Sequence, residues 1–396
     1  MDQLDSSGGL ICDVDSILSE SVKDELLLAA LPGATVEKYY GVRVVRYRNQ
    51  VILRKQITHL GNPWPPFKKR IQIPQTWIAA ERQARGDGLV PRFIGIYHYG
   101  LVTIFTDFDP DTYVKRKANN SAAHLATNDL FQALTAGQFS RVDRNGNRLT
   151  SVRADEFEAY VQTGYDSFDP RLEIMKRFNA EFLATGTLDA LDATKQMHAA
   201  GWPHAFQGEW PGFYLEYRLA EYIRHHGVQH TVAFQQVKNR GVDYDLVFER
   251  ATKATFFGDL KASDVTKHEA PGNDAEDIMR CVEQFGRFWY VIYEHRTVHA
   301  RDRADVATIA WNEWRRSVGH KGRREFDPLS YSRRFKESVR FVRMMVLEVN
   351  QANFQIVLGE FAQGKQPNGA SRALKVMINK RNIDNFLIYS ESVDAS

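Results

Sequence analysis

The sequence is poor in cysteine. Cys12 and Cys281 are the two cysteines among 396 residues. Two thiols so far apart are too few for the disulfide framework of a small secreted domain, or for a zinc site built from thiolates. We therefore expect a fold stabilised by hydrophobic packing, and a chain of this length can bury a sizeable core.

The sequence also has no long hydrophobic run. No stretch approaches the roughly 18 apolar residues that a membrane-spanning helix requires. The first residues, MDQLDSSGGL, contain acidic side chains where a secretory signal has a basic segment followed by an apolar one. These absences predict a cytoplasmic protein that does not act in a membrane.

The net charge is small, at +3, so the charge of the whole chain points to no particular partner. The kind of cation is more informative, because the 52 basic residues comprise 34 arginines and 18 lysines. The planar guanidinium of arginine suits phosphate and guanine recognition better than the point charge of lysine does.

Negative charge is absent from residues 38–70, which hold nine cations and no Asp or Glu. With interspersed tyrosines, this run predicts a basic β-ribbon that contacts DNA, although a solvated sheet face or a protected edge strand has the same pattern. A second basic region spans 296–343 and is expected to contact DNA as a loop, with a surface helix pair as the alternative. The predicted DNA-binding residues are Arg43, Arg46, Arg48, Arg54, Lys55, Lys68, Lys69, Arg70, Arg323 and Arg324.

Two domains are expected, a β-rich DNA-recognition domain over 1–160 and a catalytic α/β domain over 161–396. In the first, residues 39–57 are rich in Val, Ile and Tyr with interspersed Arg and predict a hairpin that turns near Asn49. Residues 74–86 predict a helix, residues 92–108 a strand pair that turns at Gly100, and Asn145-Gly146 a further hairpin.

In the second domain, residues 212–227 have the spacing of an amphipathic helix that ends at Gly227. Short strands are predicted at 231–237, 244–249 and 254–262. A helix over 274–288 and an apolar strand over 289–295 follow.

The stretch FFGDLKASD places an acid and a lysine at the end of a buried strand. Alternate side chains of a strand share a face, so Asp259 and Lys261 point the same way. An antiparallel hairpin with the preceding strand brings Asp245 close to them. Of the 18 lysines, Lys261 alone has an acid two residues before it. Glu216 on the preceding helix is a third candidate carboxylate, and oxygen ligands of this kind bind Mg²⁺.

This arrangement resembles the PD-(D/E)XK nuclease superfamily, which includes many restriction endonucleases. Asp245, followed by Asp259-Leu260-Lys261 at a strand end, is similar to its motif, and the elements over 205–296 follow its helix, three-strand, helix, strand order. Tyr244 stands where the family often has proline, and Asp243 could replace Asp245 as the first acid. The resemblance implies Mg²⁺ bound by Asp245, Asp259 and Glu216, with Lys261 near the nucleophile.

We therefore expect an α/β protein with a mixed-sheet PD-(D/E)XK core that cuts double-stranded DNA at a specific sequence, as a type II restriction endonuclease of a restriction-modification system does. A homodimer is expected if both strands of a palindrome are cut. Two alternatives remain open: a structure-specific repair or recombination nuclease with the same core, and a DNA-binding protein without catalytic activity.

Overall fold

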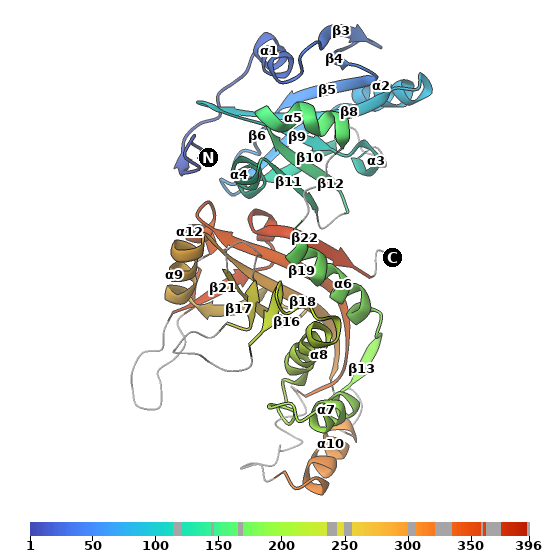
Figure 1. Cartoon of the computed structure of the whole chain (residues 1–396), viewed down its shortest axis with the longest axis vertical. Helices are drawn as coiled ribbons and strands as arrows, with labels where there is room; N and C mark the ends of the chain where they lie inside the picture. The colour runs from blue at the N-terminus through green and yellow to red at the C-terminus, as the bar shows by residue number, and fades with distance from the viewer. Residues whose placement is uncertain are drawn as a thin grey trace. The chain divides into compact units, whose positions relative to one another are not determined.

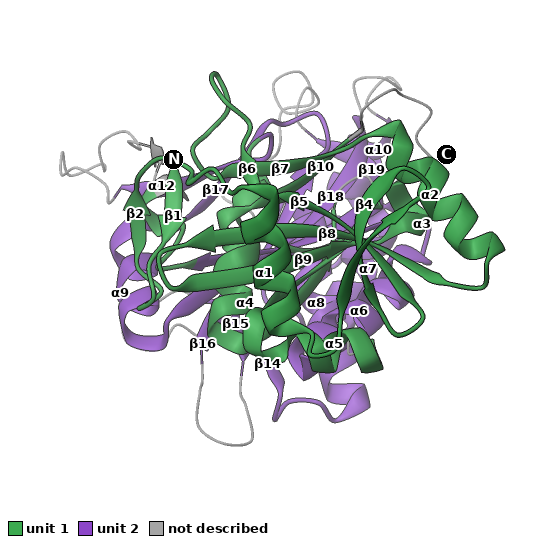
Figure 2. Ribbon diagram, turned by 90° about the horizontal axis from the view of Figure 1, so that it is seen from above, with its two compact units in different colours: residues 1–168, 350–356, 382–390 green, residues 169–349, 357–381, 391–396 purple. Residues whose placement is uncertain are grey.

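The computed structural model divides the chain into two compact units, which Figure 2 shows in different colours. Unit 1 comprises Met1–Phe168, Asn350–Ile356 and Asn382–Ser390, and unit 2 comprises Asp169–Val349, Val357–Arg381 and Glu391–Ser396. The sequence placed a single boundary after residue 160, and no composition change announces the two late segments of unit 1. The structure describes residues 1–113, 121–143, 146–164, 169–235, 244–248, 256–299, 306–320, 335–357, 359–361 and 374–393.

A mixed seven-stranded sheet forms the centre of unit 1 (Figure 1). Its strand order is β11-β12-β9-β8-β5-β4-β3, and all neighbours are antiparallel except β5 and β8. Its strands are β3 (Thr35–Tyr39), β4 (Val42–Tyr47), β5 (Gln50–Gln56), β8 (Val90–Tyr99), β9 (Val102–Phe108), β11 (Gln138–Val142) and β12 (Arg148–Arg153). The predicted hairpins β4–β5, β8–β9 and β11–β12 are confirmed, although Asn145 lies outside the described residues.

Both faces of this sheet are buried, because successive side chains of a strand enter opposite cores. In β5, Leu53 packs with Phe93 in one core, whereas Ile52 packs with Phe105 in the other. Helices and smaller sheets cover the two faces. They are β1 (Asp2–Leu4), β2 (Leu10–Cys12), α1 (Glu20–Ala30), β6 (Thr58–His59), β7 (Lys68–Ile73), α2 (Gln75–Gly86), α3 (Pro110–Tyr113), β10 (Ser121–Ala126), α4 (Thr127–Ala136), η1 (Ala154–Glu156) and α5 (Phe157–Thr163).

Buried asparagines join the late segments of unit 1 to its helix α4. The Asn350 side-chain amide donates to Asn128 Oδ1 at 2.8 Å, and the Asn128 backbone N–H donates to Asn385 Oδ1 at 3.2 Å. Asn353 donates to the Asn385 carbonyl at 3.0 Å. Amides supply both donors and acceptors, so segments more than 200 residues apart in sequence satisfy one another's buried polar groups.

Unit 2 also contains a mixed sheet, in the order β13-β19-β18-β16-β15-β14. Strands β14, β15 and β16 are antiparallel neighbours, whereas β16 and β18 run parallel with helix α9 (Ala275–Phe285) between them in the chain. The strands are β13 (Thr187–Asp189), β14 (Val232–Phe234), β15 (Leu246–Phe248), β16 (Phe256–Asp264), β18 (Arg287–His299) and β19 (Lys336–Asn350). The predicted hairpin of the Asp245 and Asp259 strands is confirmed.

The helices of unit 2 include the predicted helix that carries Glu216. This helix, α8, ends with Gly227 in the left-handed conformation at φ 65°, as the sequence indicated. A further small sheet has the order β17-β21-β20. The remaining elements of the chain are α6 (Pro170–Leu183), α7 (Ala190–Ala199), α8 (Trp210–His226), β17 (Glu269–Asp274), α9 (Ala275–Phe285), α10 (Val306–Ser317), α12 (Phe354–Val357), β20 (Gly359–Phe361), β21 (Lys375–Asn379), η3 (Ile383–Asn385) and β22 (Leu387–Ser392).

Close packing around Gly258 fixes strand β16 next to the predicted site. A Cβ at this position would lie 2.6 Å from the Phe248 ring and 2.7 Å from the Trp289 carbonyl oxygen. We expect Gly258→Ala to reduce the free energy of unfolding by about 1–3 kcal/mol, because neither neighbour can move without disturbing the sheet. Urea unfolding measures this, with Gly212→Ala as control, since a Cβ there meets nothing within 4 Å. Equal effects of both substitutions would contradict the prediction.

Candidate active site

The register of β15 and β16 brings the two predicted acids together. Leu246 is opposite Gly258 in this antiparallel pair, which sets Asp245 across from Asp259. The Leu260 backbone N–H donates to Asp245 Oδ2 at 3.2 Å and holds this carboxyl at the start of its strand. Asp243, the alternative first acid, lies outside the described residues.

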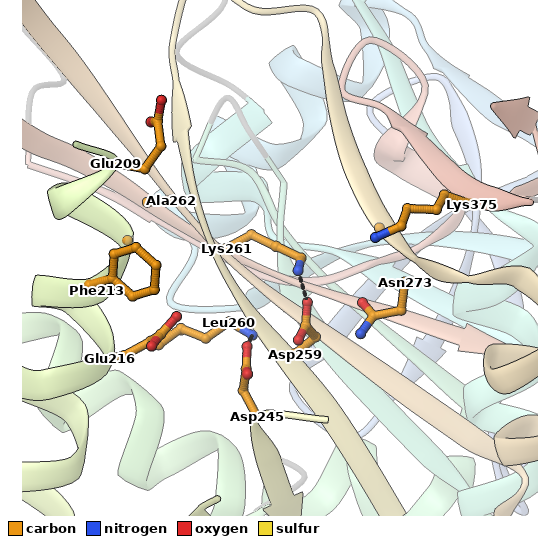
Figure 3. Close-up of a pocket in the computed structure, with 12 residues that line it drawn as sticks. Glu209, Phe213, Glu216, Asp245, Asp259, Leu260, Lys261, Ala262, Asn273 and Lys375 are labelled. Atoms are coloured by element: carbon orange, nitrogen blue, oxygen red, sulfur yellow. Dashed lines mark hydrogen bonds and ion pairs between the residues drawn. The ribbon is translucent and has the colours of Figure 1, made fainter. Parts of the chain in front are cut away.

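Asp245, Asp259, Lys261 and Glu216 line one cavity of about 300 Å³ within unit 2. In Figure 3 the two aspartates and Lys261 rise from the strands, and Glu216 approaches them from α8. Helix α8 lies against β14 and β16, so this placement follows from helix packing. Glu221, five residues further along α8, is outside the cavity and forms an ion pair with Arg224 at 2.7 Å.

Asp259 and Lys261 form an ion pair inside this cavity. Asp259 is buried, with 2% of its surface exposed. Burial alone lowers the pKa of the Lys261 ammonium, but the Asp259 carboxylate, with smaller contributions from Asp245 and Glu216, outweighs burial and raises that pKa. Lys261 is therefore a cation at neutral pH and can donate hydrogen bonds, but it cannot accept a proton.

The surroundings of Asp245 favour the neutral form of its carboxyl, whereas those of Lys261 favour the charged form of its amine. Burial, reinforced by the charge of Asp259 and a hydrogen bond with its carboxylate, raises the pKa of Asp245 to about 9. Two carboxylates this close cannot both be ionised at low cost without a nearby positive charge. A cation with more charge than the Lys261 ammonium would reduce the repulsion between these two carboxylates.

The chemistry of these donors fits Mg²⁺, which prefers oxygen ligands and is commonly held by one or two carboxylates together with water and substrate phosphate. Asp245 and Asp259 supply such a pair. Among the residues that the structure describes, no three His, Cys, Asp or Glu side chains converge as a ready-made metal site. Glu216 lines the same cavity, and its role as a third ligand stays a prediction.

We expect Asp245→Asn to stabilise the metal-free protein at pH 8. A folded-state pKa near 9, above the ordinary 3.8, means that the folded chain keeps a proton that the unfolded chain has lost. Stability therefore falls as the pH rises from about 4 towards 9. The amide needs no proton, so the variant should gain at least about 1 kcal/mol at pH 8 and little at pH 4. Urea unfolding in EDTA across this range is the measurement.

Asp264, at the end of the neighbouring strand β16, is the matched control. Burial would raise its pKa, but hydrogen bonds from Thr297 and Thr266 outweigh burial and lower the pKa to about 2. Its ionised form thus adds stability above pH 4, which is lost as the pH falls towards 2, and Asp264→Asn should destabilise the protein at pH 8. Changes of the same sign in both variants would contradict the electrostatic account.

Several lining residues were not found by sequence reasoning. Lys375 on β21 and Asn273 on β17 approach the cavity on the side away from α8, whereas Phe213 approaches from α8 itself (Figure 3). Lys375 lies more than 100 residues after Lys261, and no motif links the two. Only the pairing of β17 with β21 brings Lys375 to this cavity.

The cations predicted to bind DNA have acidic partners that the sequence did not indicate. Arg54 is buried and pairs with Asp24, and Lys69 is buried with Asp15 at 3.8 Å. The absence of acids within 38–70 is thus compensated by carboxylates from elsewhere in unit 1. We therefore correct the prediction for Arg54 and Lys69, because a buried cation with a partner is not available to a phosphate.

The other predicted cations lie at or near the surface of unit 1. Arg43 pairs with Asp24 at 2.6 Å, Arg46 with Glu37 at 3.2 Å and Lys68 with Asp384 at 3.2 Å. Arg48 is exposed, and Lys55 and Arg70 are half-buried. Arg323 and Arg324 lie outside the described residues. Arg43 and Arg48 are the exposed residues among the described candidates, and DNA contact by any of them stays a prediction.

One comparison with known proteins gave a match. A family model described as Methylase-associated X1 (MTaX1) matches residues 48–161, within unit 1. This match suggests an association with restriction-modification systems. No curated protein matches the chain.

In the described ranges, no helix is both long and apolar enough to cross a membrane.

Proposed function

We propose that unit 2 is a nuclease of the PD-(D/E)XK type that hydrolyses phosphodiester bonds of double-stranded DNA. The observation that carries this proposal is the convergence of Asp245, Asp259 and Lys261 at one end of the β15–β16 pair, beside Glu216. The element order α8, β14, β15, β16, β17, α9, β18 supports it, because, apart from the added strand β17, it follows the order of that nuclease core.

The methylase association of residues 48–161 favours a restriction endonuclease over a repair nuclease. A restriction enzyme acts on the same DNA sequences that its companion methylase protects. Unit 1 would supply sequence recognition, and a homodimer would match the two-fold symmetry of a palindromic site. Both statements rest on the proposal of nuclease activity.

Hydrolysis adds the oxygen of a water molecule to the scissile phosphorus and releases one ester oxygen, which leaves with a proton. Asp245 and Asp259 would hold Mg²⁺, which supplies positive charge to the phosphate oxygens when bound. Lys261, which is protonated, donates hydrogen bonds to the attacking water or to the developing negative charge. Lys375 offers a second ammonium on the other side of the cavity, where an adjacent phosphate can be held.

The test is incubation of the full chain with phage DNA in Mg²⁺ and, separately, in EDTA. Discrete fragments that form in Mg²⁺ and not with Asp259→Asn support a sequence-specific nuclease. Fragments only from branched or nicked DNA would instead favour a structure-specific nuclease. Retained DNA binding with no cleavage of any substrate would leave a non-catalytic DNA-binding protein and would overturn the proposal.

A further inference from the structure

A second cavity, of about 380 Å³, lies within unit 1. It is formed where β8 and β12 begin and β9 ends, with α5 beside them. All of its lining residues except Gly164 belong to the 48–161 segment that the family model matches. Its volume is at the small end of the range for ligand-binding cavities, about 300–1,000 Å³, and suits a ligand of roughly nucleoside size.

A buried carboxylate in the wall of this cavity has one unused oxygen. Asp107 is 6% exposed, and its Oδ2 accepts hydrogen bonds from Arg92 and from the Tyr160 hydroxyl, the latter at 2.9 Å. Its Oδ1 has no hydrogen-bond partner in the part of the chain that the structure describes. A buried oxygen without a partner is costly, so a ligand that donates an N–H to it would be stabilised.

The cations around this cavity differ in how far they are already engaged. Arg92 donates to Gln50 and Asp107, and Arg85 pairs with Glu81 and with Asp111 at 2.7 Å. Arg148 is exposed and forms no ion pair with any described residue. It is therefore the cation available to an anionic group of a ligand.

Leu89, Val90, Pro91 and Pro110 give the cavity an apolar wall, while Thr150 and the carboxylates of Asp109 and Asp111 also line it, the last of them paired with Arg85. A simple anion would leave Asp107 Oδ1 unpaired, and a simple cation would leave Arg148 unused. A ligand with three parts fits these groups. A flat neutral ring packs against the apolar wall, an amine on its edge donates to Asp107 Oδ1, and an attached phosphate accepts from Arg148. We propose that this cavity binds one nucleotide, whose base donates an exocyclic amine to Asp107 and whose phosphate contacts Arg148.

Such a nucleotide can come from two sources, a free mononucleotide or a base turned out of a DNA strand. The inference goes beyond the proposed nuclease and does not depend on cleavage. The experiment therefore uses the Asp259→Asn protein, so that cleavage of the DNA by unit 2 does not affect the result.

In the first arm, calorimetry measures binding of dAMP, dCMP and the purine nucleotide that differs from dAMP only in lacking the exocyclic amine. In the second arm, a duplex carries one 2-aminopurine, which has an exocyclic amine and becomes more fluorescent when it leaves the base stack. We expect the amine to improve binding about tenfold or more in the first arm, or fluorescence to rise in the second.

Asp107→Asn and Arg148→Ala should each reduce the signal about tenfold or more, while Arg82→Ala, an exposed arginine of α2 outside the cavity, should not. Because Asp107→Asn removes the partner of Arg92 and can disturb folding, Arg148→Ala decides the matter on its own. A signal in the first arm alone indicates a free nucleotide, and a signal in the second arm indicates an extrahelical base. The proposal is overturned if neither arm gives a signal, or if Arg148→Ala binds as the parent does.

Discussion

Lys261→Gln is expected to slow Mg²⁺-dependent DNA cleavage by about 10³-fold while leaving DNA binding unchanged. Glutamine keeps a hydrogen-bond donor and most of the side-chain volume, but it removes the positive charge that Asp259 holds in the cavity. The lost charge acts on the transition state, in which the phosphate becomes more negative. Single-turnover cleavage of a labelled duplex measures the rate, and gel shifts in EDTA measure binding.

Lys267→Gln is the matched control, because Lys267 is exposed just beyond the end of the same strand and does not line the cavity. Lys261→Arg retains the charge and should recover part of the rate. Thermal unfolding in Mg²⁺ checks that each variant is folded. Cleavage by Lys261→Gln at the parental rate would remove Lys261 from the proposed active site.

The second large effect is expected in unit 1, where Asp129 and Arg141 form a buried ion pair. Asp129 is fully buried and accepts from Arg141 Nη2 at 2.8 Å and from the Ala126 backbone N–H at 2.7 Å. Asp129→Asn leaves the Arg141 charge buried without a counter-charge, which costs about 3–5 kcal/mol. For a unit of this size, the melting temperature should fall by roughly 10 °C.

Asp155→Asn provides the control, since Asp155 pairs with Arg153 through the same two-oxygen geometry on the surface. An exposed pair contributes at most about 1 kcal/mol, so this variant should melt near the parental temperature. The double change Asp129→Leu with Arg141→Met should recover part of the loss, because it leaves no buried charge. Similar melting temperatures for Asp129→Asn and Asp155→Asn would contradict the assignment of a buried pair.

Residues 124–129 show why polar residues in a sequence do not identify a DNA contact. Asp129 belongs to a polar stretch whose side chains could read bases, but the structure assigns it to the start of α4 and to Arg141. The basic run 38–70 gives the same lesson, because its cations meet Asp15, Asp24 and Asp384 in space. Charge along a sequence does not reveal which charges are neutralised by residues far away in the chain.

The sequence by itself determined the strands and helices that carry the candidate active site. Alternation with a period of two placed Asp259 and Lys261 on one face of β16, and the short segment to Asp245 required an antiparallel neighbour. Only the tertiary structure decided that Lys375 completes the cavity, that residues 350–356 and 382–390 belong to unit 1, and that Asp107 lines a second cavity. The physical reason is that periodicity and turn chemistry act between near neighbours, whereas burial, charge pairing and cavities depend on residues that only the packed chain brings together.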